Sequence, residues 1–317
     1  MDSRTSKVSV VGAGAVGATL AYAGLMRGMA RTVALYDINT AKVEAEALDL
    51  AQGIQFMPEA KVIGSDNVEV CADSDVVVIT AGAKQQPGQS RLELAGATIN
   101  LMKAIIPPLI EVSPDAIYIL VTNPVDVVTY AALNISGMSP AQMFGSGTVL
   151  DSSRLRHQVA QECDVAVSNV HAYVAGEHGD SEVPLWSSAT IGGVPLTEWH
   201  DADGRIVMTS EVRDRIRHDV TRSAYRIIEG KGATNYAIGV AGARIVEAVL
   251  QDQNRVLPVS TLIDYPGVGE VCMALPAVVG RTGVKHRVDV PLDAEEAVAL
   301  EQSARSIREV AERFGAA

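Results

Sequence analysis

The first 145 residues alternate short, almost continuously apolar runs with longer amphipathic stretches. The runs are rich in β-branched residues, which is typical of parallel strands covered on both faces. We expect four such strands, at Lys7–Val11, Thr32–Tyr36, Asp75–Thr80 and Ala116–Thr122. The stretches between them predict helices at Val16–Met26, Thr40–Gln52 and Ser90–Ile106, with the last ending at Pro107-Pro108. This alternation indicates an α/β fold with a doubly wound parallel sheet of the Rossmann type.

The pattern changes after about residue 145. A predicted helix at Ser152–Cys163 is followed by shorter strands, by turns at Gly192-Gly193 and Asp203-Gly204, and by long helices. The last helix has one apolar stripe, made by Leu300, Ala304, Ile307, Ala311 and Phe314. No internal repeat or low-complexity linker separates the halves. We therefore expect two domains in one compact body, residues 1–145 and an α+β domain of residues 146–317.

Composition and charge restrict the classes of protein. The chain has 317 residues, of which 48% are apolar and 20% charged, so it is globular. A formal net charge of −12 argues against nucleic-acid and membrane partners, since both require clustered positive charge. The basic segment from Arg213 to Arg226 has apolar residues at helical spacing and predicts the solvent face of an amphipathic helix.

Cysteine usage indicates the compartment. Cys71, Cys163 and Cys272 lie far apart, without a CxxC pair or a histidine at ligand spacing. We expect three buried thiols, no disulfide and no zinc site, in a reducing compartment such as the cytoplasm. An uncharged run from Val8 to Met26 imitates a secretory signal, but cleavage there would remove the glycine motif described next, so we expect it to belong to the folded domain.

A glycine-rich turn joins the first expected strand to the first helix. Gly12, Gly14 and Gly17 have the spacing G-x-G-x-x-G. The first glycine permits the tight turn, the second lets a pyrophosphate approach the backbone, and the third lets helix and strand pack closely. Asp37, twenty residues past Gly17, ends the second strand, where it could bind both ribose hydroxyls and repel a 2′-phosphate. The two features together predict a dinucleotide site that prefers NAD to NADP.

Four further segments place polar residues among apolar ones, and each also has an ordinary structural explanation. VTNPVD (121–126) ends the fourth strand, where such sheets bind ligands, although Asn-Pro is common in plain turns. In GSGTVLDSSRLR (145–156), Asp151 and Arg154 share one helix face and could form a surface ion pair. In HAYVAGEHGDSEVP (171–184), His178 lies in an acidic turn, where most histidines are surface residues. The loop GAKQQPGQSR (82–91) supplies Arg91.

Together and in this order, the motifs resemble those of the lactate/malate dehydrogenase family, and most closely its bacterial L-lactate dehydrogenases. The resemblance runs from about Val8 to Phe314 and is most specific in GAGAVG, TAGAKQQPGQSRLEL, VTNPVD, LDSSRLR and GEHGDSEVP. It implies an NAD-dependent enzyme of fermentation that transfers hydride reversibly between NADH and pyruvate, giving L-lactate. The first domain would bind NAD, and the second would carry the catalytic residues and the contacts between subunits.

The resemblance also implies a role for each polar residue. His178 would be the acid–base group, since the unperturbed pKa of histidine, about 6.5, lies near working pH. Asp151 would orient its imidazole, as a carboxylate does in hydrolase triads. Arg154 would bind the substrate carboxylate through its planar fork, and Arg91 would close over the site and polarise the carbonyl. The substrate site would be completed by Gln85, Asn123 and Thr234.

The cofactor would contact residues from several strand ends. They are Gly12, Gly14, Val16, Gly17, Asp37, Lys42, Gly82, Ala83, Asn123 and Ser146. We expect no metal site. The segment HDADG (200–204) lacks the later glutamate of a calcium loop, and HGD offers too few ligands.

Gln85 bears on the choice between lactate and malate. In malate-specific relatives the matching residue is an arginine that pairs with the second substrate carboxylate. A neutral amide would leave that carboxylate nearly unpaired in the closed site, which costs roughly 3–5 kcal/mol. The loss corresponds to ~10²–10³-fold in discrimination. Lys84 should project to the other side of the loop, and Gln89, a glutamate in many lactate relatives, bears on loop movement. We therefore expect pyruvate as substrate.

Two alternatives stay open. One is a dehydrogenase for malate or a branched 2-hydroxy acid, because one sequence does not give the pocket volume. The other is a non-catalytic NAD-binding sensor, which would need the glycine turn and Asp37 but not Arg91, Asp151, Arg154 and His178 together.

Arg156 and His171 match positions at which bacterial family members bind fructose 1,6-bisphosphate across a subunit interface. An arginine and a histidine paired by symmetry make a cationic pocket for a bisphosphate. The alternative is a helix-surface arginine and an ordinary histidine. The resemblance implies a homotetramer in which the effector favours an active arrangement.

Overall fold

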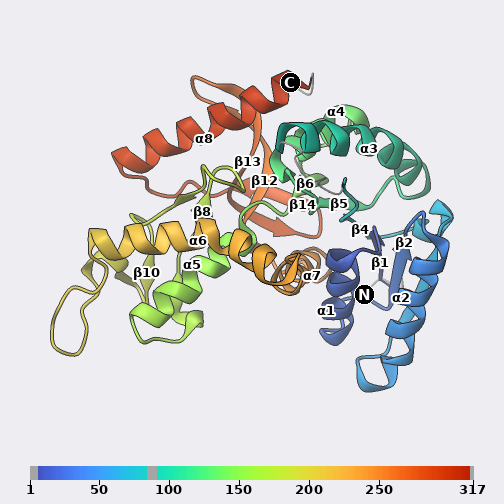
Figure 1. Cartoon of the computed structure of the whole chain (residues 1–317), viewed down its shortest axis with the longest axis horizontal. Helices are drawn as coiled ribbons and strands as arrows, with labels where there is room; N and C mark the ends of the chain where they lie inside the picture. The colour runs from blue at the N-terminus through green and yellow to red at the C-terminus, as the bar shows by residue number, and fades with distance from the viewer. Residues whose placement is uncertain (1–5, 84–90, 315–317) are drawn as a thin grey trace.

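The computed structural model describes residues 6–83 and 91–314. In this part of the chain one nine-stranded sheet runs through the molecule in the order β14-β13-β12-β6-β5-β4-β1-β2-β3 (Figure 1). The strands of the first half are parallel, as the sequence predicts. They are β1 (Lys7–Val11), β2 (Thr32–Tyr36), β3 (Lys61–Ser65), β4 (Val76–Ile79), β5 (Ile117–Leu120) and β6 (Met143–Gly145).

Helices cover both faces of the parallel strands. They are α1 (Ala15–Met26), α2 (Thr40–Gln52), α3 (Arg91–Val112) and α4 (Val125–Ser136). Val8 and Val10 of β1 pack into the core layer that contains α1 and α2, whereas Val11 packs into the layer that contains α3 and α4. Each strand therefore needs apolar residues on both faces, which explains the almost continuous apolar runs.

Two of the parallel strands, β3 and β6, were not predicted from the sequence. β3 lies at the edge of the sheet and has no fully buried residue, and β6 has three residues. Neither contains the continuous apolar run by which the other four strands are recognised. The doubly wound fold is confirmed, and two strands are added to it.

The predicted end of a helix at Pro107-Pro108 is wrong, because both prolines lie inside α3. The carbonyls that lose a helical partner belong to Lys103 and Ala104, on an exposed turn where water can bind them. Ile106 and Leu109 are buried against the sheet on either side of the pair. Packing therefore keeps the helix continuous where its backbone bonds are interrupted.

α3 is also the one helix, among the described residues, that is long and apolar enough to cross a membrane, over Leu94–Val112. Core helices pass the same test, so one such helix is weak evidence for a span. Ile99, Met102 and Ile106 of this helix are buried in the core layer against the sheet. A third of the apolar window is buried in the structure, and these three residues belong to that part.

The second half extends the same sheet with antiparallel strands: β12 (Arg255–Tyr265), β13 (Gly269–Gly280) and β14 (Gly283–Arg287). β12 joins the parallel part through Ser260, which pairs with Gly145 of β6. The sequence predicts only short strands here, and that is wrong for β12 and β13. Prolines argue against long strands, but Pro258 and Pro276 lie opposite one another in the ladder.

Shorter strands and helices complete the second half. The strands form two small sheets, β7 (Val170–His171) with β10 (Thr190–Ile191) and β11 (Val194–Pro195), and β8 (Val174–Ala175) with β9 (Val183–Pro184). The α-helices are α5 (Val149–Glu162), α6 (Ser210–Lys231), α7 (Tyr236–Leu250) and α8 (Ala294–Arg313). Short 3₁₀ helices lie at Ile54–Phe56, Val68–Cys71, Val167–Asn169 and Leu196–Glu198.

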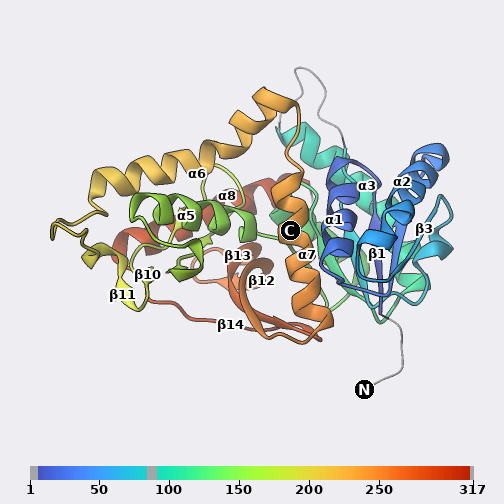
Figure 2. The same ribbon diagram turned by 90° about the horizontal axis from the view of Figure 1, so that it is seen from below.

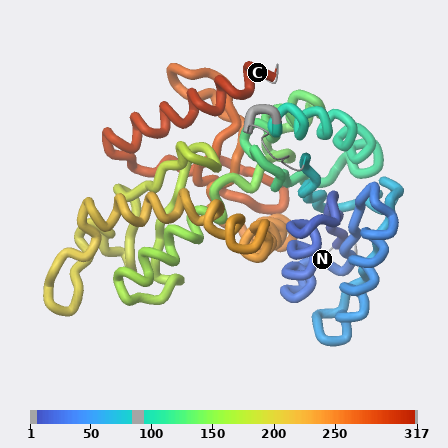
Figure 3. Tube along the Cα trace, in the orientation of Figure 1, coloured from blue at the N-terminus to red at the C-terminus, as the bar shows by residue number. Residues whose placement is uncertain are grey.

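The helices connect the two halves. α7 stands between them and packs against α1 (Figure 2). α8 buries its predicted apolar stripe against the sheet and ends beside α3 and α4, where Phe314 lies against Gly96 (Figure 3). α6 is the predicted amphipathic helix, but its stripe is buried only at Ile216 and Val220, and Ile227 and Ile228 near its end are exposed.

The three cysteines are buried and free, as expected. Burial raises the pKa of Cys71 and Cys163 to about 11, and it raises the pKa of Cys272 well above its ordinary value. Thiols with such pKa values stay protonated and unreactive at neutral pH.

Candidate active site

The turn between β1 and α1 has the shape that a dinucleotide requires. Gly12 has φ of +101°, and a Cβ atom there would lie 2.7 Å from the backbone nitrogen of Ala81. A Cβ atom on Gly17 would collide with the carbonyl oxygen of Gly12. A Cβ atom on Gly14, by contrast, would meet nothing within 4 Å, so this residue faces open space. The outer glycines are thus required by packing, and the middle one leaves room for phosphates at the start of α1.

Asp37 lies directly beside this turn. Its Oδ2 atom accepts a hydrogen bond of 2.8 Å from the backbone N–H of Ala13, and its Oδ1 atom accepts one of 3.0 Å from Asn39. The carboxylate is therefore held at the end of β2 within reach of the glycine turn. The residues of the turn fit NAD, and Asp37 lies at the position from which the sequence predicts a contact with the ribose.

The other expected cofactor residues follow the ends of neighbouring strands. Gly82 and Ala83 come after β4, Asn123 after β5 and Ser146 after β6. A Cβ atom on Gly82 would collide with the hydroxyl of Thr122, so the chains after β4 and β5 approach closely. Because parallel strands end at the same edge, these residues share one side of the sheet with the glycine turn.

Four expected residues lie away from these strand ends or outside the described part of the chain. Val16 is half-buried in α1, and Lys42 is exposed in the first turn of α2. Gln85 lies outside the described residues, as does the side chain of Arg91, whose backbone begins α3.

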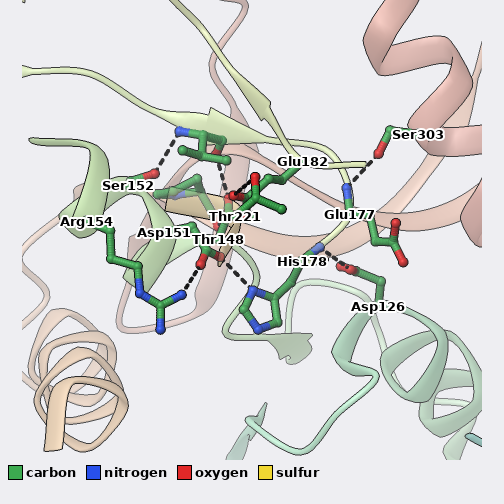
Figure 4. Close-up of polar contacts among 12 residues, drawn as sticks. Asp126, Thr148, Asp151, Ser152, Arg154, Glu177, His178, Glu182, Thr221 and Ser303 are labelled. Carbon is green, nitrogen blue, oxygen red and sulfur yellow. Dashed lines mark hydrogen bonds and ion pairs between the residues drawn. The ribbon is translucent and has the colours of Figure 1, made fainter. Parts of the chain in front are cut away.

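Asp151 connects the expected acid–base group to the expected substrate arginine. It lies in the first turn of α5 with 2% of its side chain exposed. Its Oδ2 atom is 2.6 Å from Nδ1 of His178, and its Oδ1 atom accepts a hydrogen bond of 2.7 Å from Arg154 (Figure 4). Asp151 and Arg154 therefore do not form a surface ion pair. The Asp151 carboxylate is buried and contacts His178 with one oxygen and Arg154 with the other.

The loop that carries His178 is held by its backbone from two sides. The N–H of His178 donates to Oδ2 of Asp126 in α4, at 2.8 Å, and the N–H of Glu177 donates to Oγ of Ser303 in α8, also at 2.8 Å (Figure 4). β8 and β9 pair on either side of the loop. The imidazole is thus positioned by three elements that are distant in sequence.

The contacts set the protonation of the pair. Burial by itself would lower the pKa of His178, but the Asp151 carboxylate, with smaller effects of Asp126 and Glu182, raises it to about 9. Burial would likewise raise the pKa of Asp151, and the charges and hydrogen bonds of His178 and Arg154 outweigh it, so its pKa is lowered. At neutral pH the pair is an imidazolium and a carboxylate.

Glu182 is a third acid at this position that the sequence did not indicate as a site residue. It is buried, and its Oε1 atom accepts a hydrogen bond of 2.9 Å from the hydroxyl of Thr221 in α6. Burial and the nearby Asp151 charge raise the pKa of Glu182 to about 8. One atom each of Asp151, His178 and Glu182 lie within 4.8 Å of one another, a spacing that a cation could use, but the charged His178 and Arg154 would repel one.

The remaining expected residues lie further along the second half. Thr234 is half-buried between α6 and α7. Arg156 in α5 donates from Nε to the carbonyl of Ala172 at 2.8 Å and stacks 5.0 Å from the ring centre of Tyr173. His171 is exposed on β7, a strand against which α5 packs.

Known families match both halves of the chain. The lactate/malate dehydrogenase NAD-binding domain matches residues 6–145, and the lactate/malate dehydrogenase α/β C-terminal domain matches residues 148–316. Because the two matches together span nearly the whole sequence, they account for both the glycine turn and the His178 loop.

Individual relatives agree with this assignment. The chain is 56% identical over 313 residues to an L-lactate dehydrogenase of Bifidobacterium animalis subsp. lactis, covering 98% of each chain. It is 43% identical to one of Thermoanaerobacter pseudethanolicus, covering 96% of this chain and 98% of the relative. These two relatives therefore resemble it over almost their full length.

Solved structures share the fold. A lactate dehydrogenase from a Medee basin deep-sea metagenome library superposes with a TM-score of 0.94 at 37% identity, covering 98% of this chain and 99% of that one. The minor L-lactate dehydrogenase of Enterococcus mundtii gives a TM-score of 0.93 at 35% identity, covering 98% of each. The chain belongs to the lactate/malate dehydrogenase family.

Proposed function

We propose that this chain catalyses the reversible reduction of pyruvate to L-lactate with His178 as the acid–base group. Its family is one of NAD-dependent oxidoreductases, and the relatives of highest identity described above are L-lactate dehydrogenases. The observation that carries the residue-level proposal is the buried contact between His178 and Asp151, with Arg154 on the other oxygen of the same carboxylate.

The reaction needs a proton donor at the carbonyl oxygen of pyruvate and a residue that binds its carboxylate. NADH supplies the hydride that adds to the carbonyl carbon. Charged His178 keeps one proton on Nδ1, against Asp151, and donates the other from Nε2 to the carbonyl oxygen. In the reverse direction neutral His178 takes the hydroxyl proton of lactate at Nε2. Asp151 stabilises the charged imidazole in both directions.

Arginine side chains orient the substrate. Arg154 uses one nitrogen for Asp151, and the rest of its planar guanidinium binds the carboxylate of pyruvate. Arg91 polarises the carbonyl when the loop before α3 closes over the site, a role supported by its motif. Asn123 and Thr234 line the substrate site. Gln85 selects pyruvate over oxaloacetate because a neutral amide cannot pair with a second carboxylate.

The cofactor site uses the glycine turn and the strand ends. Gly12, Gly14 and Gly17 bind the pyrophosphate, and Asp37 binds the ribose. Further contacts come from Val16, Lys42, Gly82, Ala83, Asn123 and Ser146. Residues 1–145 form the NAD-binding domain and residues 146–317 the catalytic domain. No metal ion takes part.

The active assembly is a homotetramer in the cytoplasm that fructose 1,6-bisphosphate activates through Arg156 and His171. Exposed apolar side chains on α1, α6 and α7 support the assembly, because α1 packs against α7 and contiguous apolar surface marks contacts between proteins. They are Tyr22, Met26, Ile228, Tyr236 and Val240. The buried free cysteines suit a reducing compartment.

One assay tests these assignments. NADH oxidation is measured with pyruvate, oxaloacetate and 2-oxoisocaproate, each with and without fructose 1,6-bisphosphate. Pyruvate should be turned over fastest, and the effector should shift its saturation curve in the wild type but not in His171→Ala. Faster turnover of oxaloacetate would refute the substrate assignment, and no turnover with any 2-oxo acid would favour the NAD-binding sensor. An unchanged pyruvate curve with effector would refute the regulatory assignment.

A further inference from the structure

Asp126 is a buried acid that the reaction scheme above does not use. It lies in the first turn of α4, three residues after Asn123, and is 2% exposed. The sequence alone gives no reason to separate it from the rest of VTNPVD. Buried carboxylates are rare unless they are paired, so its surroundings require an explanation.

The contacts of Asp126 point to His178. Its Oδ2 atom accepts the backbone N–H of His178 at 2.8 Å. Its Oδ1 atom is buried and, among the described residues, accepts no hydrogen bond of good geometry, although the hydroxyl of Ser260 lies nearby. The carboxylate therefore has one well-made hydrogen bond, and that bond goes to the catalytic loop.

In the part of the chain that the structure describes, few other titratable groups face Asp126. They are His178 and Glu177 on the loop and Cys272 on β13. Burial raises the pKa of Asp126 to about 6, against the lowering effects of Ser260 and of the N–H and charge of His178. Asp126 is thus ionised above neutral pH, in the range where His178 titrates.

We propose that Asp126 is a positioning residue for the acid–base group, which fixes the peptide of His178 and adds negative charge beside its imidazolium. The inference rests on the proposed function of His178. Asp151 contacts the imidazole of His178 at Nδ1. Asp126 binds the backbone N–H of His178, and its negative charge also favours the charged imidazole. Glu182 and Arg154 also contribute to the field at His178, so the effect of Asp126 must be isolated by changing its charge alone.

The matched pair of variants is Asp126→Asn and Ser303→Ala. Asparagine keeps an acceptor oxygen for the His178 N–H but removes the charge. Ser303→Ala removes a neutral acceptor from the adjacent peptide, that of Glu177, and changes no charge. If Asp126 only holds the loop, Asp126→Asn, which keeps the acceptor, should leave the pKa of His178 unchanged. The proposal predicts that this pKa falls in Asp126→Asn and not in Ser303→Ala.

The readout is the pKa of His178, measured by NMR of histidine-labelled protein without cofactor or substrate. The chain has six histidines, and the His178 signal is the one missing in His178→Gln. Asp126→Asn should lower this pKa by about one unit, the lower end of the effect of a neighbouring opposite charge. Its kcat/KM for pyruvate reduction should accordingly fall more at pH 9 than at pH 6.5. Ser303→Ala should leave the pKa unchanged.

The interaction between Asp126 and His178 can also be measured through the pKa of Asp126. His178→Gln should raise the pKa of Asp126, followed by its carboxyl carbon signal, by as much as Asp126→Asn lowers that of His178. This measurement decides the question even if Asp126→Asn does not fold. A His178 pKa that stays at the wild-type value in Asp126→Asn, or moves no more than in Ser303→Ala, would overturn the proposal, and so would an Asp126 pKa unaffected by His178→Gln. Undiminished turnover by His178→Gln would instead refute the proposed function, without bearing on the coupling.

Discussion

The Nδ1 atom of His178 lies 2.6 Å from Oδ2 of Asp151, and this carboxylate is almost completely shielded from solvent. The other carboxylate oxygen binds Arg154. In the proposed mechanism, proton transfer and substrate binding both depend on this one buried group, so a change at Asp151 should affect both.

Asp151→Asn should lower kcat for pyruvate reduction by about 10²-fold or more, the scale of a general-acid contribution. The amide cannot stabilise the imidazolium, and it breaks the ion pair with Arg154, so KM for pyruvate should rise as well. Steady-state kinetics with NADH measures both. The control is Asp164→Asn, just past the same helix, where φ of +51° suits asparagine equally well. Equal kcat values in the two variants would contradict the assigned role.

The pH dependence of turnover should report the raised pKa of His178. Pyruvate reduction needs the charged imidazole, so kcat/KM for pyruvate should stay level from pH 6.5 to 8 and fall above about 9. Lactate oxidation needs the neutral imidazole, so its kcat/KM should rise over the same range. Stopped-flow measurements in both directions test this. An inflection near 6.5, the ordinary value for histidine, would show that Asp151 does not raise the pKa as inferred.

Stability should decline in alkali because Glu182 and His178 bind protons more tightly in the folded protein than in the unfolded chain. The pKa of Glu182 is raised from 4.5 to about 8, so its contribution is fully present below pH 4.5 and is lost as pH rises through 8. That of His178 is raised from 6.5 to about 9, so its contribution is fully present below 6.5 and is lost through 9. Glu182→Gln should therefore lose less unfolding free energy than the wild type between pH 6 and 9.

Urea unfolding at the two pH values measures this difference. Thr221→Val is the comparison variant, because it removes the hydrogen bond to Glu182 but leaves the acid in place. That bond lowers the pKa of Glu182, so Thr221→Val should lose at least as much unfolding free energy as the wild type between pH 6 and 9. If Glu182→Gln and the wild type lose the same free energy, Glu182 is already ionised at neutral pH.

Asp37→Ser should weaken NADH binding and reduce the preference for NADH over NADPH. The carboxylate beside the glycine turn would repel a 2′-phosphate, and serine would not. The ratio of kcat/KM for the two cofactors should change by about tenfold or more, the equivalent of ~1.4 kcal/mol. Asp66→Ser, which changes an exposed acid at the end of the neighbouring strand β3, is the control and should leave the ratio unaltered.

Gln85→Arg should shift the preference from pyruvate toward oxaloacetate by ~10²–10³-fold, because the arginine can pair with the second carboxylate. The measured quantity is the ratio of kcat/KM for the two substrates. Gln89→Arg adds the same charge to the same loop at another position and should change the ratio little. A pyruvate preference that survives in Gln85→Arg would remove Gln85 from the specificity assignment.

Local patterns were sufficient for the nucleotide-binding half. The spacing of Gly12, Gly14 and Gly17, with Asp37 at the end of the next strand, predicted a turn that the structure shows in detail. Four strands were found because each is buried on both faces. These features are made by residues close together in the sequence, so the local pattern was enough to predict them.

Features made by distant segments were not predictable in this way. Asp126 and Glu182 occur inside recognised motifs, but an acid at the start of a helix or in a loop is normally solvated, and nothing local shows that either one is buried. Their burial depends on packing by β13, α6 and the sheet, far along the chain. The long β12–β13 hairpin was not predicted for the same reason. Its prolines are tolerated because Pro258 and Pro276 lie opposite one another, and the sequence does not show this register.

The contact between β6 and β12 has a consequence for dividing the molecule. Gly145 pairs with Ser260, and a Cβ atom at Gly145 would lie 2.5 Å from the hydroxyl oxygen of Thr129 and 3.1 Å from Cβ of Ser260. A fragment cut after this residue would present β6 as a bare edge, open to association with other strands. Each half completes the sheet of the other. The two halves should therefore not be separated or recombined at this point.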